Sequence, residues 1–271
     1  MDENLSHAPP RLLVDAPNFR DIGGLRGADG RVVRHRQVFR SGALDQLLDE
    51  DLVRLAGFGL GLCCDLRSAT ERERSPSRWP PGAAPRLLEL EFATDIRTLS
   101  PELILALSQA PGPDKALQVM LGLYRAMPVT AAPLLARLLP ELADAPDALP
   151  AVIHCTAGKD RTGFVVAVLL RVLGVAEADI LADYLHSNHS AGELRRNVKV
   201  QALLEQLLGM KPDPHAVQAL TGARPDYLDA ALGEVRRAHG SVESYLAEAS
   251  GVDLEMQERL RHRLLEPAAL R

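Results

Sequence analysis

The chain has 271 residues, of which 46% are hydrophobic but only 4% aromatic, so Leu, Ala and Val must supply most of its core. Its net charge is −5, from 31 Lys and Arg residues against 36 Asp and Glu. A nucleic-acid-binding surface normally needs an excess of positive charge, so no nucleic-acid partner is expected. The length fits one large domain, and we predict a single domain over residues 1–271.

Targeting signals and cysteine usage bear on the compartment. Residues 1–10 are polar and lack the apolar stretch of a secretory signal, and no uninterrupted apolar run reaches membrane-spanning length. Stable membrane insertion is therefore not expected. The three cysteines include the adjacent pair Cys63 and Cys64 and do not form a disulfide framework. This pattern predicts a cytoplasmic protein, with secretion without a leader left open.

The first part of the chain predicts strands alternating with a helix. Residues 18–40 mix short apolar runs with glycines, which indicates short strands joined by turns. Residues 45–56 carry leucines at helical spacing. Buried strands are predicted over residues 60–66 and 86–92. The charged segment between them, residues 67–78, predicts a turn because prolines follow it.

Residues 95–128 predict a helical insertion. Prolines bracket two helix-prone stretches there, residues 102–109 and 114–126. A helical pair between the core strands could form a lid. A separate helix is predicted over residues 130–143, with Thr130 as its N-cap.

The second half predicts one strand followed by helices. The strand covers residues 151–154, a tight loop follows, and a helix runs from about residue 162 to 173. Further helices are predicted over residues 178–187, 192–208, 214–220, 225–238, 242–249 and 254–265. Strands that alternate with helices, followed by helices alone, favour an α/β fold with a helical C-terminal region.

The loop between this strand and helix carries the chemistry. Five residues separate Cys155 from Arg161, and one of them is a glycine. A short loop that leads onto a helix N-terminus directs its backbone N–H groups at one point, where the helix dipole also favours negative charge. We predict that this loop binds a phosphate group, through Thr156, Ala157, Gly158, Lys159, Asp160, Arg161 and Thr162.

A thiol in such a site ionises readily, and the thiolate can attack phosphorus in a bound phosphoester. The planar guanidinium of Arg161 suits bidentate contact with phosphate oxygens. Those oxygens carry much of the charge of the transition state. Cys155 and Arg161 are therefore the predicted nucleophile and phosphate ligand, and the Thr162 hydroxyl could stabilise Cys155 as the leaving thiolate.

The segment His-Cys-Thr-Ala-Gly-Lys-Asp-Arg-Thr-Gly at residues 154–163 resembles the Cys-x5-Arg signature of protein tyrosine phosphatases. More narrowly, it resembles bacterial tyrosine phosphatases, mycobacterial ones among them, that have Gly-Lys-Asp-Arg in this loop. Weaker matches follow the same order along the chain, at residues 18–21, 39–41, 65–68 and 183–188. The resemblance implies a tyrosine-phosphatase-like central sheet flanked by helices, a helical lid, and hydrolysis of phosphotyrosine. Phosphoserine, phosphothreonine or phosphoinositides are further substrates that it allows.

Phosphocysteine chemistry also needs a proton donor for the leaving group. Asp65 ends a predicted strand at the sheet edge where sites gather, and the resemblance assigns it the acid role. Pairing with Arg67 is the alternative for this carboxylate. Asp160 and Asp95 are the second and third candidates.

For several other residues, the sequence allows two roles. Lys159 could bind a second phosphate, as a phosphoinositide substrate would require, or could face solvent. Arg20, Arg40 and Arg67 could contact substrate or form ion pairs. Tyr124 could shield the pocket or pack in the core. Either Cys63 or Cys64 could form a disulfide with Cys155, or both could be buried hydrophobes.

Two other classes of function remain open from the sequence. A rhodanese-like sulfurtransferase also has a loop cysteine after a strand, although its loop is usually one residue shorter. A phosphate-binding module without catalysis would keep the loop and lack the acid. The histidines show no metal-ligand spacing, so no metal and no other cofactor is expected.

Overall fold

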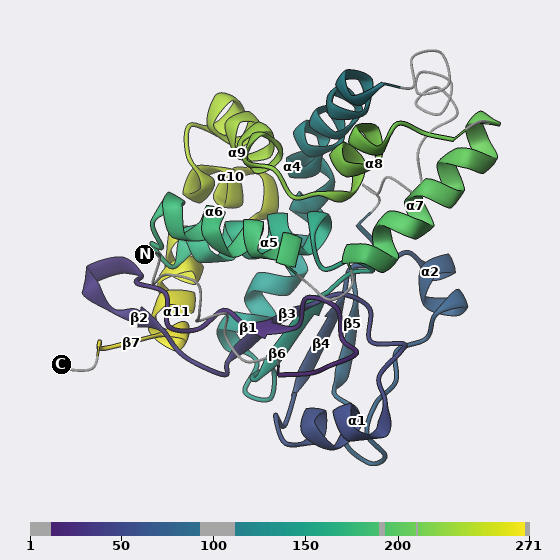
Figure 1. Ribbon diagram of the computed structural model, residues 1–271. Helices are drawn as coiled ribbons and strands as arrows, with labels where there is room; N and C mark the ends of the chain where they lie inside the picture. Colours follow the sequence, from purple (N-terminus) through teal and green to yellow (C-terminus); the bar gives the residue numbers. More distant parts are fainter. Residues whose placement is uncertain (1–11, 93–111, 190–192, 210, 269–271) are drawn as a thin grey trace, which may run out of the picture.

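The computed structural model describes residues 12–92, 112–189, 193–209 and 211–268. Five strands form the central sheet, in the order β1-β3-β6-β4-β5 (Figure 1). Strands β3, β6, β4 and β5 run parallel to one another, and β1 is antiparallel to β3. The bounds are Arg20–Asp21 for β1, Val38–Ser41 for β3, Leu62–Asp65 for β4, Arg86–Glu89 for β5 and Ala151–His154 for β6.

The register of the parallel strands brings distant residues to one edge of the sheet. Ser41 and Asp65 both pair with His154, and all three are the last residues of their strands. Cys155 follows directly. Because the carboxyl ends of parallel strands meet at the same edge, the loop after β6 lies beside the loops after β3 and β4.

Both faces of the sheet are covered, as an α/β fold requires. Phe39, Cys63 and Val152 share one face and pack in a cluster with Leu55 of helix α1 (Asp49–Ala56). The neighbouring positions of these strands point to the opposite face and belong to the main core, together with helix α5 (Asp160–Val172). The predicted α/β sheet flanked by helices is confirmed.

Helix α4 (Pro113–Asp144) differs from the prediction of two separate helices. It is continuous through Pro128, Pro133 and Pro140, and the hydroxyl of Thr130 caps no helix but donates to the carbonyls of Ala126 and Met127. Each internal proline costs about 3 kcal/mol. Burial of a large apolar side chain returns about 1.5–3 kcal/mol, and α4 buries such residues along its whole length.

The predicted lid over 95–128 lies partly outside the described residues, which resume at residue 112. The part that is described opens α4. Helix α4 is also long and apolar enough to cross a membrane by length and composition alone, with 50% of its most apolar stretch buried. Its buried residues belong to the main core.

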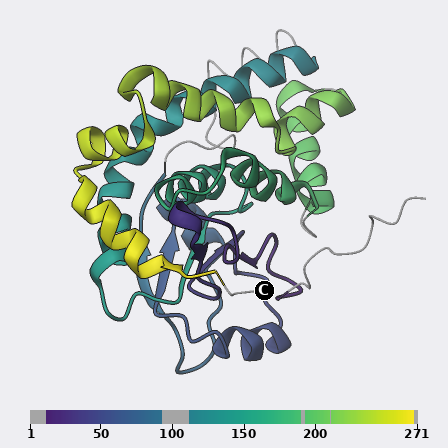
Figure 2. The ribbon, with the colours of Figure 1, turned by 90° about the vertical axis from the view of Figure 1, so that its left-hand side faces the viewer.

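The C-terminal region is helical, as predicted. Figures 1 and 2 show the helices of residues 214–250 beyond α5, on the side of the sheet away from α1, whereas the last helix (yellow) runs down beside the sheet. A two-stranded sheet of β2 and β7 was not predicted, because strands of two residues have too short a pattern to detect. The bounds are Val32–Val33 for β2, Glu177–Leu185 for α6, Glu193–Leu208 for α7, Pro214–Thr221 for α8, Pro225–His239 for α9, Val242–Ser250 for α10, Leu254–Leu264 for α11 and Leu265–Glu266 for β7. Two short 3-10 helices cover Ala28–Gly30 and His186–His189.

Candidate active site

The loop from Cys155 to Lys159 joins β6 to α5, and the cysteine is nearly inaccessible, with 2% of its surface exposed. Its sulfur accepts a hydrogen bond from the backbone N–H of Gly158 at 3.2 Å. Gly158 has a φ of +66°, and a Cβ there would lie 2.5 Å from the backbone of Ser41 and Gly42. The tight curl of the loop around the sulfur therefore requires glycine at this position.

The carbonyl of Gly158 is held away from the centre of the loop. Asn18 donates its Nδ2 to this oxygen at 2.6 Å, and Arg40 donates Nη2 at 2.8 Å. In a trans peptide the C=O and the following N–H point in opposite directions. The N–H of Lys159 is consequently directed away from Asn18 and Arg40.

The carbonyl of Thr156 is held in the same way, because it accepts the N–H of Ala43 at 3.0 Å. The N–H of Ala157 therefore points away from the β3 side. Helix α5 begins three residues later and presents its own first N–H groups. Alternate amides of the loop and the start of α5 together form a positively polarised concave surface next to the sulfur, which is an anion site.

Arg161 lies in the first turn of α5 and is fixed by Glu71. Its Nη1 and Nη2 bind the two carboxylate oxygens of Glu71 at 2.8 and 2.9 Å, and Nη1 also donates to the Leu66 carbonyl at 3.3 Å. The hydroxyl of Thr156 donates to Glu71 as well. This carboxylate therefore orients both a side chain of the loop and the guanidinium.

Glu71 belongs to the short helix α2 (Ala69–Arg74), which was predicted as a turn. Ser68 and Glu71 form a capping box, in which the Ser68 hydroxyl accepts the Glu71 N–H and the Glu71 carboxylate accepts the Ser68 N–H. The Ser-x-x-Glu spacing is a sequence signal for this box. Burial alone would raise the pKa of Glu71, but the hydrogen bonds and charge of Arg161 outweigh it and lower that pKa well below its usual range.

Replacing Glu71 by Gln is expected to lower kcat by roughly 10- to 100-fold without raising KM. The amide cannot accept both guanidinium bonds, so Arg161 loses its orientation while its charge remains. Steady-state kinetics on an aryl phosphate measures both constants. Glu73→Gln, an exposed position in the same helix, is the matched control. A higher KM with an unchanged kcat would contradict this prediction.

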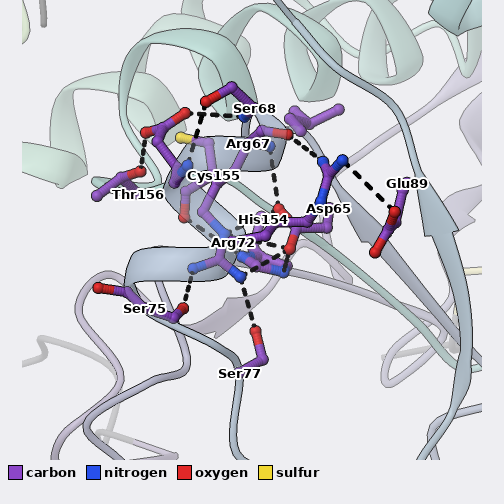
Figure 3. A network of polar contacts seen from close by, with 12 residues as sticks. Asp65, Arg67, Ser68, Arg72, Ser75, Ser77, Glu89, His154, Cys155 and Thr156 are labelled. Carbon is purple, nitrogen blue, oxygen red and sulfur yellow. Dashed lines mark hydrogen bonds and ion pairs between the residues drawn. The ribbon is translucent and has the colours of Figure 1, made fainter.

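Asp65 forms a buried ion pair with Arg67 (Figure 3). Arg67 Nε lies 2.9 Å from Asp65 Oδ1, Arg67 Nη2 lies 2.7 Å from Oδ2, and the Arg67 N–H donates to Oδ1. His154 Nε2 is 3.4 Å from the same carboxylate, and His154 Nδ1 is 3.3 Å from the Cys155 carbonyl. Burial by itself would raise the pKa of Asp65, but His154 and Arg67 outweigh it, and the pKa falls below its ordinary value.

Asp183 of α6 holds two arginines behind the loop. Arg20 Nε lies 2.8 Å from Asp183 Oδ1, and Arg40 Nη1 binds Oδ2. Arg40 is completely buried and also holds the Gly158 carbonyl, so this carboxylate supports the loop indirectly. Burial would raise the pKa of Asp183, but the positive charges of Arg40 and Arg20 lower it below the ordinary value. All three arginines, Arg20, Arg40 and Arg67, thus form ion pairs.

Replacing Asp183 by Asn is expected to destabilise the fold by about 3–5 kcal/mol at neutral pH, because a buried guanidinium loses its counter-charge. Urea denaturation measures this loss, with exposed Asp179→Asn on the same helix as control. The stabilisation belongs to a carboxylate with a lowered pKa. It is fully present above about pH 4 and disappears as the pH falls through the folded-state pKa. A gap between wild type and variant that does not shrink in acid would contradict the assignment.

Lys159 and Asp160 face the helical region. Lys159 is 1% exposed, and its Nζ donates to the carbonyls of Leu220, Thr221 and Gly222 at 3.3, 2.8 and 3.0 Å. Of the two roles that the sequence left open for Lys159, a side chain that faces solvent is therefore wrong. Asp160 Oδ1 accepts the hydroxyl of Tyr124 at 2.6 Å. Burial first, and then the charge of Asp160, raise the pKa of Tyr124 well above its ordinary value.

The adjacent cysteines face opposite sides of β4. Cys64 pairs in register with Ile153 and shares its core cluster with Cys155, whereas Cys63 lies in the other cluster. Cys64 therefore lies in the same core cluster as Cys155, and Cys63 packs on the opposite face of the sheet. All three cysteines are free and buried. A disulfide with Cys155 thus stays a hypothesis for Cys64 alone.

Asp95, the third candidate acid, lies outside the described residues. Within the described ranges, no group of three or more His, Cys, Asp or Glu side chains could hold a metal ion. Thr162 is completely buried, and its hydroxyl has no hydrogen-bond partner among the residues that the structure describes.

Known proteins are similar in sequence to this chain along most of its length. A sequence model described as the tyrosine phosphatase family matches residues 12–266. A Cupriavidus necator protein named as a tyrosine-protein phosphatase is 36% identical over 241 residues, covering 88% of this chain and 82% of its own. The triple specificity protein phosphatase PtpB of Mycobacterium tuberculosis is 32% identical over 282 residues, covering 94% and 99%.

A tyrosine-protein phosphatase of Nostoc commune is 27% identical over 236 residues, covering 81% of this chain and 71% of its own. The family match spans the strands, the Cys155 loop and the helical C-terminal region together. The resemblance predicted from the loop is confirmed, and hydrolysis of phosphate monoesters replaces the sulfurtransferase and binding-module alternatives. The chain belongs to the tyrosine phosphatase family.

Proposed function

We propose that Cys155 attacks the phosphorus of a phosphotyrosine side chain and carries the phosphoryl group as phosphocysteine. The P–O bond of the ester breaks as the S–P bond forms, and the leaving oxygen takes a proton from an acid. Water then attacks phosphorus, the S–P bond breaks, and the thiolate and inorganic phosphate are released. The observation that carries this proposal is the Gly158 N–H on the sulfur, inside a loop with outward-facing carbonyls.

Arg161 and the inward-facing amides would hold the phosphate oxygens in this mechanism. The two Nη groups of Arg161 are engaged by Glu71, which sets the plane of the guanidinium. A preset donor that needs no reorganisation stabilises developing charge most effectively. The Thr162 hydroxyl, one residue after Arg161, would stabilise the Cys155 thiolate as it leaves in the second step. Its lack of a hydrogen-bond partner among the described residues supports this role.

For the proton donor, we propose Asp160 in place of the first candidate, Asp65. An acid must carry a proton at working pH, whereas Arg67 binds both oxygens of Asp65 and the pKa of Asp65 is lowered. The side chain of Asp160 is partly exposed, at 24%, at the start of α5. The Lys159 ammonium at 3.3 Å and the Tyr124 hydroxyl both contact its Oδ1, whereas Arg67 holds both oxygens of Asp65. Asp65 then positions the loop through His154 and Arg67.

The dependence of the rate on the leaving group distinguishes Asp160 from Asp65 as the acid. Loss of an acid slows a poor leaving group more than a good one, because a good one departs without protonation. In Asp160→Asn, kcat for phenyl phosphate is expected to fall about tenfold more than kcat for 4-nitrophenyl phosphate. Asp65→Asn should lower both rates by the same factor. The opposite pattern would return the acid role to Asp65.

The substrate class follows from the family and its relatives. The family and the relatives from Cupriavidus necator and Nostoc commune are named tyrosine phosphatases, and the mycobacterial relative is named a triple specificity protein phosphatase. We propose phosphotyrosine as the main substrate, with phosphoserine, phosphothreonine and phosphoinositides as further substrates to be ranked by kcat/KM.

Trapping of the intermediate tests the proposed chemistry directly. The enzyme is mixed with 4-nitrophenyl phosphate in the presence of a chelator, quenched in acid during turnover, and digested. A peptide that contains Cys155 with one added phosphoryl group supports the proposal. Turnover without any phosphorylated Cys155 peptide in a rapid-quench series would contradict it, as would an absence of turnover with the thiols kept reduced.

A further inference from the structure

The catalytic loop is joined to the end of helix α8 by Lys159. The ammonium is buried and lies 2.8–3.3 Å from three successive carbonyl oxygens, those of Leu220, Thr221 and Gly222. It also forms an ion pair with Asp160 Oδ1 at 3.3 Å. A helix leaves the carbonyls of its last turn unbonded, and its dipole makes that end negative. A lysine ammonium has three protons to donate. Lys159 thus supplies the charge and the donors that this helix end lacks.

Each of the last four carbonyls of α8 has a partner. The Gln218 carbonyl accepts the N–H of Gly222, and the Ala219 carbonyl accepts the hydroxyl of Tyr227 from α9 at 2.7 Å. The carbonyls of Leu220 and Thr221 both accept Nζ of Lys159 from the catalytic loop. The helix end is therefore held from two directions, by the loop and by Tyr227.

A second connection runs parallel to the first. The Asp160 carboxylate accepts the hydroxyl of Tyr124, which also lies 2.7 Å from the Tyr184 hydroxyl. The Tyr124 ring stacks on Tyr227 with centroids 5.3 Å apart. Asn188 bonds both backbone groups of Ala223, just beyond α8. Lys159 of the loop and Asp160, the first residue of α5, are thus both anchored in the helical region.

We propose that Lys159 is a positioning residue, which sets the geometry of the phosphate-binding loop from the end of α8 and does not read a second phosphate of the substrate. The proposal rests on the proposed function of the loop. Gly158 is held from the sheet side by Asn18 and Arg40, and its neighbour Lys159 is held from the opposite side by α8. Opposed anchors on adjacent residues fix the direction of the peptide group between them. That group contains the Lys159 N–H, one of the amides directed toward the anion site.

The two roles for Lys159 predict different kinetics. A residue that binds a second phosphate contributes only when the substrate has one. Its loss therefore raises KM for a bisphosphate and leaves KM for a simple aryl phosphate unchanged. A positioning residue affects the turnover of every substrate, because every substrate binds its phosphate in the same loop. Misplacement of an oriented group lowers the rate of the chemical step.

The experiment compares Lys159→Met with wild type on three substrates: 4-nitrophenyl phosphate, a phosphotyrosine peptide and a short-chain phosphatidylinositol bisphosphate. We expect kcat to fall by the same factor on all three, about tenfold, with KM changed less than twofold. Lys211→Met, an exposed lysine just before α8, is the control and should match wild type. Hydrogen exchange of the amides in residues 219–223 should be faster in Lys159→Met.

Tyr227→Phe tests the same link without touching the loop, and it keeps the test decisive if Lys159→Met does not fold. Loss of its hydroxyl bond to Ala219 should lower kcat on all three substrates by about twofold to threefold. A selective rise in KM for the bisphosphate in Lys159→Met would overturn the proposal, as would wild-type kinetics in either variant. Failure of the proposed function would look different, because wild type itself would then show no turnover.

Discussion

Cys155→Ser is expected to reduce turnover of an aryl phosphate by on the order of 10⁴-fold or more. The loop favours an anion at residue 155 through the Gly158 N–H and the start of α5. Sulfur is an intrinsically strong nucleophile toward phosphorus, whereas a hydroxyl needs a base to remove its proton. The imidazole of the preceding residue, His154, is directed to the Cys155 carbonyl and to Asp65. Serine therefore stays protonated and does not attack phosphorus.

Steady-state hydrolysis with a chelator present measures this loss, and urea denaturation verifies that the variant folds. Cys63→Ala and Cys64→Ala are the matched controls, since both cysteines are buried in β4 and the proposed chemistry uses neither. Cys155→Ser should still bind a phosphotyrosine peptide, because the amides and Arg161 remain. Substantial turnover in the serine variant would remove Cys155 as the nucleophile.

Arg161→Lys is expected to lower kcat/KM by about 10³-fold, the lower end of the effect of removing an arginine from a phosphoryl-transfer site. Arginine has five donors in a rigid fork, and here its Nη groups bind Glu71, Leu66 and Thr156. A lysine has one ammonium on a flexible stem. It can neutralise Glu71 or approach the phosphate, but it cannot hold both in the same plane.

Kinetics on 4-nitrophenyl phosphate and on a phosphotyrosine peptide should show the same loss, because both substrates present the same dianion. Arg171→Lys, an exposed position near the end of the same helix, controls for a general effect of the exchange on α5. The double variant Arg161→Lys with Glu71→Gln should lose little more than Arg161→Lys alone, since the two residues act as one unit. A loss below about tenfold for Arg161→Lys would contradict the role of the guanidinium.

The local sequence was sufficient for the elements around the nucleophile. The strand over residues 151–154 was predicted with its correct bounds, and α5 begins two residues before the predicted start. Both are identified by contiguous patterns: an apolar run, a short loop with a glycine and a second apolar stretch. The family was recognisable for the same reason, because the Cys155 to Gly163 motif is contiguous.

The partners of the loop residues were decided by the tertiary structure. Arg161 meets Glu71, 90 residues earlier, and Lys159 meets α8, about 61–63 residues later. Neither pairing has a local signature, although the capping box of α2 does. The sequence also left Asp65 open between acid and ion-pair partner, and only the conformation of the segment after β4 brings the Arg67 guanidinium onto its carboxylate.

Helix α4 illustrates the same division on a larger scale. Its prolines predict breaks by local propensity, yet the helix continues through them because its apolar residues are buried against the C-terminal helices and the core. The sequence by itself determined the nucleophile loop, the strand and helix that flank it, and the family. Tertiary packing decided which charges neutralise one another, because a buried charge takes whichever partner the fold brings within hydrogen-bonding distance, regardless of separation along the chain.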